Sequence, residues 1–387
     1  MSAIEQDPVC LVRGSINIDE FFDVPQIVRP GQTISATSTS KRLGGKGANQ
    51  AKAAASAGAV VLMDGAVGRG TEGKEVIDEL CGPLRGVPDV GVDTQSGGEG
   101  RILENRIRVW QEGSTGKAMI QRAQDGENSI IILAGANFSE PSTPYTPLVP
   151  ANTTHLLLAN EIPFQSTLDY LSAAASAPSK VTSIYNPSPM PSADQLRAFP
   201  WHQVDWLIVN EGELGDIAGS VFDSSSVEPD IRTAVDSLTK ASAHDKVDEK
   251  AAIKVAQSLH SLVPRLAESQ SGRTINIICT LGAKGVLYVR SSTTSAPITK
   301  RLASAKLLRP IKDTTGAGDC FTGYLAAGLM RLQQEGKSAD DEEAFEGVVK
   351  RCLTACSICV ENEGAQDSYG TIAQVEARLA ANPIEAI

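Results

Sequence analysis

The chain lacks an excess of positive charge. Its 387 residues include 35 Lys and Arg against 46 Asp and Glu, which gives a formal net charge of −11 at pH 7. Nucleic acids and anionic membrane surfaces attract proteins that present a broad positive field. The composition therefore argues against both as partners, and any phosphate that binds must be held by local groups.

Long uncharged apolar runs are also missing. The uncharged stretch at residues 141–160 is interrupted by prolines at 141, 144, 147 and 150, so it cannot form a spanning helix. Glu5 and Asp7 stand near the start, without a basic flank before a short apolar run, which does not match a signal peptide. We expect a soluble cytoplasmic protein, with the nucleus also open for a eukaryotic source.

Cysteines are few and odd in number, which argues against a disulfide framework and favours a reducing compartment. The chain has 7 of them, and Cys356 and Cys359 have C-x-x-C spacing. Together with Cys352 they occupy positions i, i+4 and i+7, on one face of an apolar helical segment. No second C-x-x-C or His pair stands nearby, so buried small side chains are favoured over a metal or redox site.

Short β-branched runs alternate with helical patterns along most of the chain. The length fits two domains, or one large α/β domain with an appendage. Helical patterns at 48–57 and 320–332 are typical of the intervening segments. The alternation predicts an α/β fold with a mostly parallel sheet covered by helices on both faces. The runs read as strands are 9–12, 60–63, 153–158, 181–185, 206–209, 275–279 and 286–289.

Two segments, 19–43 and 104–134, show polar alternation instead and predict a small second sheet. Such a sheet, projecting over a site, would act as a lid. The predicted main domain then comprises residues 1–18, 44–103 and 135–387, with a discontinuous lid. Residues 82–100 and 220–250 have the composition of surface insertions, the second with an exposed helix.

A glycine-containing turn at residues 313–319, Asp-Thr-Thr-Gly-Ala-Gly-Asp, directly precedes an apolar helical run. Unpaired backbone N–H groups and the positive end of the helix dipole attract a phosphate at such a position. A carboxylate beside a phosphate is electrostatically unfavourable, so Asp319 needs a reason to be there. The chemistry that supplies one is proton acceptance from a hydroxyl that attacks the phosphate.

Polar residues follow several of the predicted strands. Each could be a turn or a helix cap, but ligands of open α/β sheets bind at the carboxyl ends of the strands. Five such strand ends together indicate a site. These residues are Asn17 and Asp19, then Asn160 and Glu161, Asn186, Asn210 with Glu213, and Thr280 with Gly282.

A second glycine motif, Gly-Gly-Lys-Gly-Ala-Asn at residues 44–49, stands at a strand-to-helix junction. Alone it is equally a plain turn and helix start. In company with Asn17 and Asp19 it predicts a polyol site, because vicinal hydroxyls bind carboxylates and amides. The stretch 68–75 imitates a phosphate-binding loop, but Glu75 replaces the Ser or Thr that would hold magnesium.

The two glycine motifs together resemble the two signatures of the ribokinase-type (phosphofructokinase-B) carbohydrate kinases. Intermediate pieces match in order at 14–19, 114–116, 134–137, 160–161, 210–213, 280–285 and 364–366, so the resemblance spans nearly the whole chain except the two insertions. It implies a three-layer α/β/α sandwich with a mostly parallel central sheet and a small β-sheet lid. Within the family, the first motif is similar to that of members that phosphorylate ribose.

The resemblance also implies roles for individual residues. Asp319 would accept the proton of the attacking sugar hydroxyl and contact the sugar itself, and Asn210 and Glu213 would organise phosphate and Mg²⁺, partly through water. The sugar hydroxyls would bind Asn17, Asp19, Gly45, Lys46, Asn49 and Glu161. The anion hole would be formed by Gly316, Ala317 and Gly318, and the nucleotide site lined by Thr280, Gly282, Gly285 and Gly318.

A monovalent cation, K⁺ in the family, would lie beside the anion hole. The implied ligands are Asp313, Thr315, Cys359, Asn362, Gly364 and Ser368. Here the sequence departs from the family pattern, since Asn362 stands where a basic residue is common and Asp367 where Pro is common.

The implied function is ATP-dependent phosphorylation of ribose at its 5-hydroxyl, with Mg²⁺ and K⁺, in a homodimer whose lid sheets pair. A sibling sugar or nucleoside kinase, such as a fructokinase-like enzyme, is the nearest alternative. A sugar-binding regulator without transfer activity is a further one, against which the intact Asp319, the glycines beside it and Glu213 argue.

Overall fold

The computed structural model describes residues 8–84, 100–125, 127–139, 147–222, 228–240, 248–266, 274–291 and 296–385. The predicted insertion at 82–100 lies mostly outside these ranges, and the one at 220–250 lies partly outside them. The helix predicted inside the second insertion is α6 (Pro229–Lys240), but it is not wholly exposed, because Val235 and Leu238 are buried in the core.

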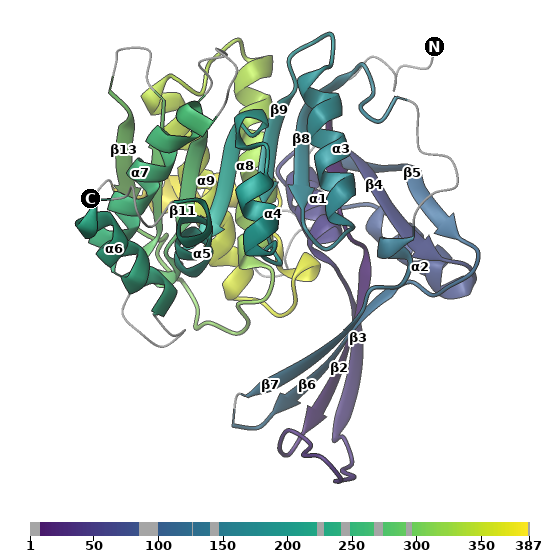
Figure 1. The fold of residues 1–387 in the computed structure, drawn as a ribbon. Helices are drawn as coiled ribbons and strands as arrows, with labels where there is room; N and C mark the ends of the chain where they lie inside the picture. Colours follow the sequence, from purple (N-terminus) through teal and green to yellow (C-terminus); the bar gives the residue numbers. More distant parts are fainter. Residues whose placement is uncertain are drawn as a thin grey trace.

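A nine-stranded sheet forms the centre of the molecule, in the order β13-β12-β11-β10-β9-β8-β1-β4-β5 (Figure 1). Neighbouring strands from β5 to β11 are parallel, whereas β12 and β13 at one edge are antiparallel. All the predicted strand segments lie in it. The strands are β1 (Val9–Arg13), β4 (Val60–Gly68), β5 (Arg101–Trp110), β8 (Thr153–Ala159), β9 (Thr182–Asn186), β10 (Trp206–Asn210), β11 (Asn276–Thr280), β12 (Val286–Arg290) and β13 (Ile298–Leu302).

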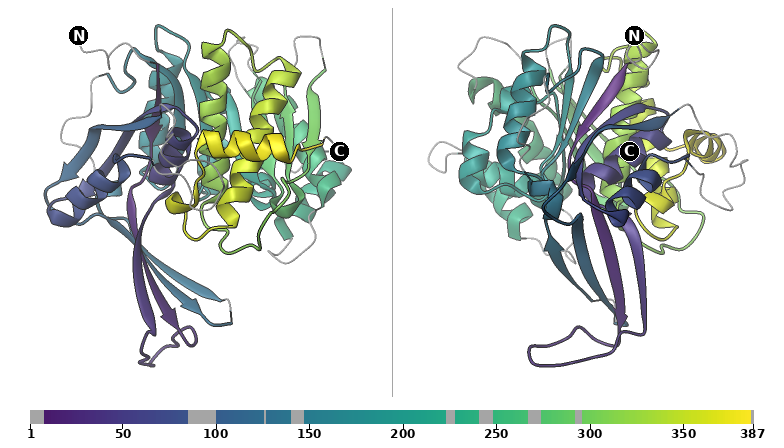
Figure 2. Two further views of the ribbon diagram at one scale, coloured as in Figure 1. Left: turned by 180° about the vertical axis from the view of Figure 1, so that it is seen from behind. Right: turned by 90° about the vertical axis from the view of Figure 1, so that its right-hand side faces the viewer.

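Helices cover both faces of this sheet (Figure 2). One layer comprises α1 (Lys46–Ser56), α2 (Thr71–Leu80), α8 (Ala317–Gln334), α9 (Glu342–Val360) and α10 (Ile372–Ala381). The other comprises α3 (Phe164–Ala175), α4 (Ala193–Ala198), α5 (Glu211–Val221), α6 and α7 (Glu249–Leu266). Cys10 and Val12 of β1 pack into the first layer, and Val9 and Leu11 into the second. Because both faces are covered, the strand is apolar throughout, and the predicted three-layer sandwich is confirmed.

A separate four-stranded sheet extends away from this body (Figure 1). Its order is β3-β2-β6-β7, formed by β3 (Ser38–Gly44), β2 (Asn17–Val24), β6 (Gly116–Ala123) and β7 (Asn128–Leu133). β2 and β6 are parallel, whereas the outer pairs are antiparallel.

One predicted lid boundary differs from the structure. Residues 104–110 do not belong to the four-stranded sheet, because β5 pairs along its length with β4 at the edge of the central sheet. Arg106 of β5 is buried there and donates from Nε to Oδ2 of Asp64, at 2.9 Å. An edge strand with one exposed side has the same alternating pattern as a lid strand, so the sequence could not separate them.

The two sheets join where the parallel strands end. β1 leads through residues 14–16 into β2, whose first residue, Asn17, pairs with Gly44 and Gly116. α1 begins immediately after β3, and Gly45 at its N-cap has φ +85°. The base of the four-stranded sheet and the carboxyl ends of the central strands therefore share one edge of the molecule.

Candidate active site

The turn before α8 places Asp319 in the first turn of that helix, where its side chain is buried. Gly316 caps the helix in the left-handed conformation, with φ +76°. A Cβ atom at this position would lie 2.6 Å from Cβ of Ala365 and 2.7 Å from Oη of Tyr369. Both the backbone conformation and these contacts favour glycine here. The turn is held at the mouth of the helix, where the Ala317 N–H donates to the Thr314 carbonyl at 3.3 Å.

Two amides of α1 bind the Asp319 carboxylate. Nδ2 of Asn49 donates to Oδ2 at 3.0 Å, and Nε2 of Gln50 donates to Oδ1 at 2.9 Å. Gln366 fixes Asn49 in turn, by donating from Nε2 to its Oδ1 at 3.0 Å. The two glycine motifs are thus joined at one carboxylate.

Gln50 and Gln366 were not among the predicted site residues. Gln50 is fully buried in a helix that is otherwise rich in alanine, and a buried amide in such a helix requires hydrogen-bond partners. A polar residue that follows Asn49 among buried alanines is the signal that could have identified Gln50 as a site residue. Gln366 lies within a segment that carried the family resemblance, but nothing in the sequence indicates its contact with Asn49.

Glu161 follows β8 in the sequence, and its side chain lies beside the first residue of α1. Its Oε2 accepts from Oγ of Ser15 at 2.5 Å and from the backbone N–H of Lys46 at 3.0 Å. Burial lowers the pKa of the Lys46 ammonium, but the charges of Asp319, Glu161 and Glu213 together raise it above its usual value. Lys46 is therefore a fixed positive charge among carboxylates.

Asp19 lies on β2, close enough to Glu161 and Asp319 for their charges to act on it. Burial, with the negative charges of Glu161 and Asp319, raises the pKa of the Asp19 carboxyl to about 7. A Cβ atom on neighbouring Gly44 would come within 2.1 Å of its Oδ2, so Gly44 makes room for the carboxylate.

Asn17 is the remaining predicted polyol ligand. Its Oδ1 accepts from Nδ2 of Asn137 at 2.7 Å, and Asn137 also accepts from the backbone N–H of Ile16 at 2.8 Å. Asn137 therefore orients Asn17 and the chain between the two sheets. The site as a whole offers carboxylates, amides and one ammonium, a set suited to a neutral molecule with several hydroxyls.

A cavity of about 360 Å³ lies beside the first turn of α8 and contains the predicted nucleotide residues Thr280, Gly282, Gly285 and Gly318. Apolar side chains line the rest of it, including Leu307, Ile311 and Phe321. Ala317 and Gly318 line the cavity at the N-terminal end of α8. This arrangement suits a flat apolar group with a phosphate tail, since the tail can reach the N–H groups of the turn.

Asn210 and Glu213 come together, and they also cap α5. Oδ1 of Asn210 accepts from the Glu213 N–H and Oε2 of Glu213 accepts from the Asn210 N–H, both at 2.9 Å. The helix-cap reading of this strand end therefore holds as well. Burial raises the pKa of the Glu213 carboxyl. The charge of Glu213 also helps to raise the pKa of Lys46, so Glu213 lies near the predicted sugar-binding residues. An oxygen-rich pair of this kind suits Mg²⁺ held partly through water.

The residues of the predicted cation site also gather in one loop region. Oδ1 of Asp313 accepts from Thr315 N–H at 2.9 Å, and Oδ2 accepts from Gly364 N–H at 3.0 Å. The side chains of Asn362 and Ser368 instead bind protein carbonyls, and Sγ of Cys359 lies 3.7 Å from the Thr315 carbonyl oxygen. Hard oxygen ligands could come from Asp313 and main-chain carbonyls, whereas the Cys359 sulfur does not suit K⁺.

The other cysteines of the predicted helical face, Cys352 and Cys356, also lie on α9. Cys352 is buried, and half-buried Cys356 donates from Sγ to the Ala317 carbonyl at 3.3 Å. Their packing agrees with the preferred reading as small core side chains.

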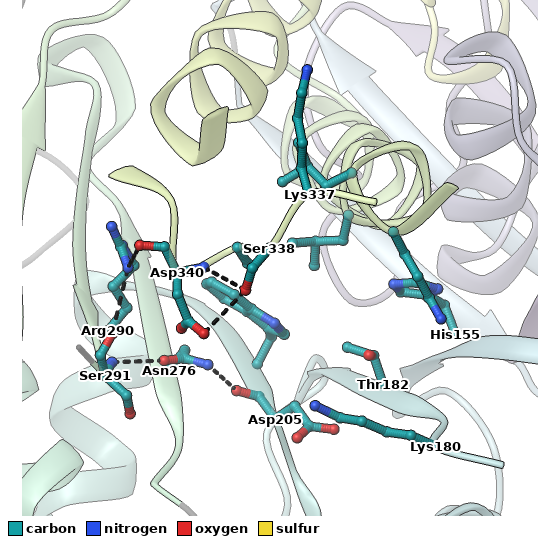
Figure 3. A pocket seen from close by; sticks show the side chains of 15 residues that line it. His155, Lys180, Thr182, Asp205, Asn276, Arg290, Ser291, Lys337, Ser338 and Asp340 are labelled. Atoms are coloured by element: carbon teal, nitrogen blue, oxygen red, sulfur yellow. Dashed lines mark hydrogen bonds between the residues drawn. The ribbon is translucent and has the colours of Figure 1, made fainter. Parts of the chain in front are cut away.

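A second cavity, of about 280 Å³, lies at the amino ends of β8 to β11 (Figure 3). It is lined by Leu329 and Leu332, near the end of α8 remote from Asp319, and by none of the predicted site residues. Its polar groups partly satisfy one another, as Asn276 does by binding the Asp205 carbonyl and the Ser291 N–H. The predicted chemistry belongs to the opposite edge of the sheet.

Comparison with known proteins matches this arrangement. The model of the pfkB family carbohydrate kinases matches residues 8–82 and 99–372. A ribokinase of Haemophilus influenzae is 29% identical over 363 residues, which cover 93% of this chain and 94% of that protein.

Solved structures agree. The chain is similar to ribokinase from Cryptococcus neoformans in complex with ADP, with 43% identity, a TM-score of 0.72, and coverage of 96% of this chain and 100% of that one. It is also similar to Arabidopsis thaliana ribokinase complexed with ribose and ATP, with 26% identity, a TM-score of 0.68, and coverage of 96% and 98%. Within the described ranges, no helix is long and apolar enough to cross a membrane.

Proposed function

Because the chain belongs to the pfkB family of carbohydrate kinases, we propose that it transfers the γ-phosphoryl group of ATP to the 5-hydroxyl of ribose. The observation that carries this proposal is the convergence of the two glycine motifs on Asp319, through Asn49 and Gln50. The chain is a sugar kinase, and the similar Arabidopsis enzyme was solved with ribose and ATP. Ribose is therefore the sugar that the relatives favour.

The sugar site comprises Asn17, Asp19, Gly45, Lys46, Asn49 and Glu161. Carboxylates accept hydrogen bonds from vicinal hydroxyls, and the ammonium of Lys46 donates to them. The raised pKa of Lys46 keeps this donor charged at neutral pH. At Gly45 the backbone lies close to that of Asn17, since a Cβ atom on Gly45 would be 2.7 Å from the N atom of Asn17.

Asp319 accepts the proton of the attacking hydroxyl. A sugar hydroxyl is a far weaker acid than a carboxylic acid, so it loses its proton only as the new P–O bond forms. Asn49 and Gln50 hold both oxygens of the carboxylate and set its direction before substrate arrives. Most of the acceleration then comes from alignment and charge neutralisation.

The N–H groups of Gly316, Ala317 and Gly318 stabilise the transferring phosphoryl group, while the adjoining apolar cavity binds the adenine end of ATP. Mg²⁺ supplies charge neutralisation on the phosphates when it is bound. Asn210 and Glu213 would hold it partly through water, and Thr280, Gly282 and Gly285 line the cavity proposed for the nucleotide.

The loop around Asp313 and Gly364 would hold the monovalent cation of the family. Asp313 would provide the charge and the loop carbonyls would provide oxygen ligands. Asn362 and Ser368 would add oxygen ligands, because their side chains only donate to protein carbonyls in these contacts and keep oxygen lone pairs.

The four-stranded sheet acts as the lid and as a dimer interface. Its outer strand β7 exposes four consecutive apolar residues, with exposed fractions of 52% for Ile130, 58% for Ile131, 64% for Ile132 and 47% for Leu133. An exposed edge strand that is apolar on both faces pairs readily with another chain, which suits a second copy of the same sheet. With sugar bound, the closed lid would exclude water from the transferring phosphoryl group.

A coupled assay of ADP release tests the function. With Mg²⁺, K⁺ and ATP present, we expect the highest kcat/KM for ribose in a panel that also contains 2-deoxyribose, fructose and adenosine. Strong turnover of another member with negligible turnover of ribose would assign the chain to a sibling substrate. Tight ribose binding without ADP release from any sugar would favour a regulator.

A further inference from the structure

Arg42 links the four-stranded sheet to the loop beside the anion hole. It lies on β3, where its Cα pairs with that of Asp19 on β2. Its side chain is only 22% exposed and leaves the sheet, with Nη2 3.0 Å from Oε2 of Glu363. A residue on the sugar-binding sheet thus contacts the turn that follows α9.

The contact is closely fitted. Gly364 has φ +81°, and a Cβ atom there would lie 2.2 Å from Nη1 of Arg42. The guanidinium therefore packs directly on the backbone of Gly364, and any larger residue would displace it. Glycine is required here both for its backbone conformation and for this contact.

The loop that Arg42 contacts is part of the catalytic framework. The Gly364 N–H donates to Oδ2 of Asp313, whose Oδ1 accepts from Thr315 N–H in the turn before the anion hole. Two residues further, Gln366 binds Asn49, which holds Asp319. Arg42 therefore contacts the residue that donates the first of these hydrogen bonds, and the residue that donates the second lies two positions further along the chain.

We propose that Arg42 is a positioning residue that fixes the sugar-binding sheet against the loop of Glu363 and Gly364. The placement of the sheet over the sugar and the shape of the anion hole are thereby linked. This inference rests on the proposed function for its catalytic consequence. Arg42 touches no reacting atom, so its loss affects alignment and water exclusion, which depend on small displacements.

The first test is Arg42→Met, with Arg122→Met as the matched control. Arg122 belongs to the same sheet and pairs with Asp23, and its substitution makes the same change in charge. We expect Arg42→Met to lower sugar kcat by about tenfold and to raise ATP hydrolysis relative to sugar phosphorylation. The melting temperature should stay nearly unchanged, because Glu363, the partner of Arg42, is 68% exposed and an ion pair with an exposed partner adds little stability. The control should match the wild type in both rates.

A double-mutant cycle isolates the contact. Glu363→Gln should reproduce part of the defect, the double variant should be no worse than Arg42→Met, and Arg42→Lys should recover part of the activity. If the rate losses of the two single variants multiplied in the double variant, the proposal would be overturned. A loss of activity explained by a lower melting temperature alone would overturn it as well.

Amide hydrogen exchange provides a readout that needs no substrate. The amides of Thr315 and Gly364 should exchange faster in Arg42→Met than in the wild type or in Arg122→Met. Faster exchange in a protein that phosphorylates no sugar would refute the proposed function but support the structural link. Unchanged exchange and kinetics in an active enzyme would refute the link alone.

Discussion

Asn49 and Asp319 are 270 residues apart in the sequence, and Nδ2 of the first lies 3.0 Å from Oδ2 of the second. The amide cannot rotate freely, because its own oxygen accepts from Nε2 of Gln366 at 3.0 Å. The direction of the Asp319 carboxylate is therefore set by the fold. Preorganisation of this kind reduces the reorganisation needed when the hydroxyl transfers its proton.

Asp319→Asn tests the proton acceptor. We expect kcat to fall by at least roughly a hundredfold, because an amide cannot take the proton, while ADP binding measured by calorimetry stays close to normal. Asp169→Asn, on the exposed side of α3, serves as the control and should keep its activity. Near-normal turnover in Asp319→Asn would show that another group handles the proton.

Lys46→Met tests the first glycine motif. The raised pKa of Lys46 predicts a charged donor to a sugar hydroxyl, and losing such a hydrogen bond should raise the sugar KM by about tenfold. Nucleotide affinity should change little. If the variant instead loses affinity for ATP alone, the motif does not bind sugar.

The Asp19 carboxyl should make both sugar binding and stability depend on pH. Its pKa of about 7 in the folded chain lies above the ordinary value of 3.8. The ionised form accepts hydroxyl hydrogen bonds, so the sugar KM should fall as pH rises through 7. Without sugar the folded chain holds the proton more tightly than the unfolded one, so stability from this group is full below pH 3.8 and is lost as pH rises to 7.

Asp19→Asn is the variant that isolates this effect. Thermal melting between pH 5 and pH 8 should show the wild type losing stability relative to the variant as pH rises. The pH dependence of the sugar KM should also flatten. Parallel curves for the two proteins would mean that Asp19 does not titrate in this range.

The sequence predicted the parts of the fold in which local pattern and burial agree. Val9 to Val12 are apolar because both faces of β1 are covered, so the run itself indicates a central strand. Residues 104–110 were assigned to the wrong sheet, since alternation reports one exposed face and not which sheet provides it. Arg106 decides the matter through its contact with Asp64, which only the folded chain reveals.

The site was predictable where a motif fixes the backbone. Gly316 needs its left-handed conformation, and Asp319 follows at the helix start, so both could be located from sequence spacing. The raised pKa of Asp19 could not, because Glu161 and Asp319 approach it only in three dimensions. Gln50 was missed for the same reason, as its bond to Asp319 joins distant segments.

Ile131→Lys tests the proposed dimer. Ile131 is 58% exposed on β7, so a lysine should be tolerated by the monomer and should place like charges together across paired sheets. Sedimentation at micromolar concentration should give a dimer for the wild type and a monomer for the variant. Lys41→Ile lies on β3, at the opposite edge of the same sheet, and is a control for general effects on the lid. A monomeric wild type would refute the interface.

A pair of alanine substitutions separates the chemical role of the anion hole from its structural role. Gly316→Ala should destabilise the fold, by roughly 1–2 kcal/mol for the left-handed backbone alone, with the contact to Ala365 in addition. Gly318→Ala meets no atom within 4 Å and lies inside α8, where alanine is the better helix former. Its melting temperature should therefore hold or rise. Its kcat should still fall, since the new methyl group lies beside the nucleotide cavity, where the phosphoryl group would bind. If Gly318→Ala keeps full activity, the transferring phosphoryl group does not lie against this turn.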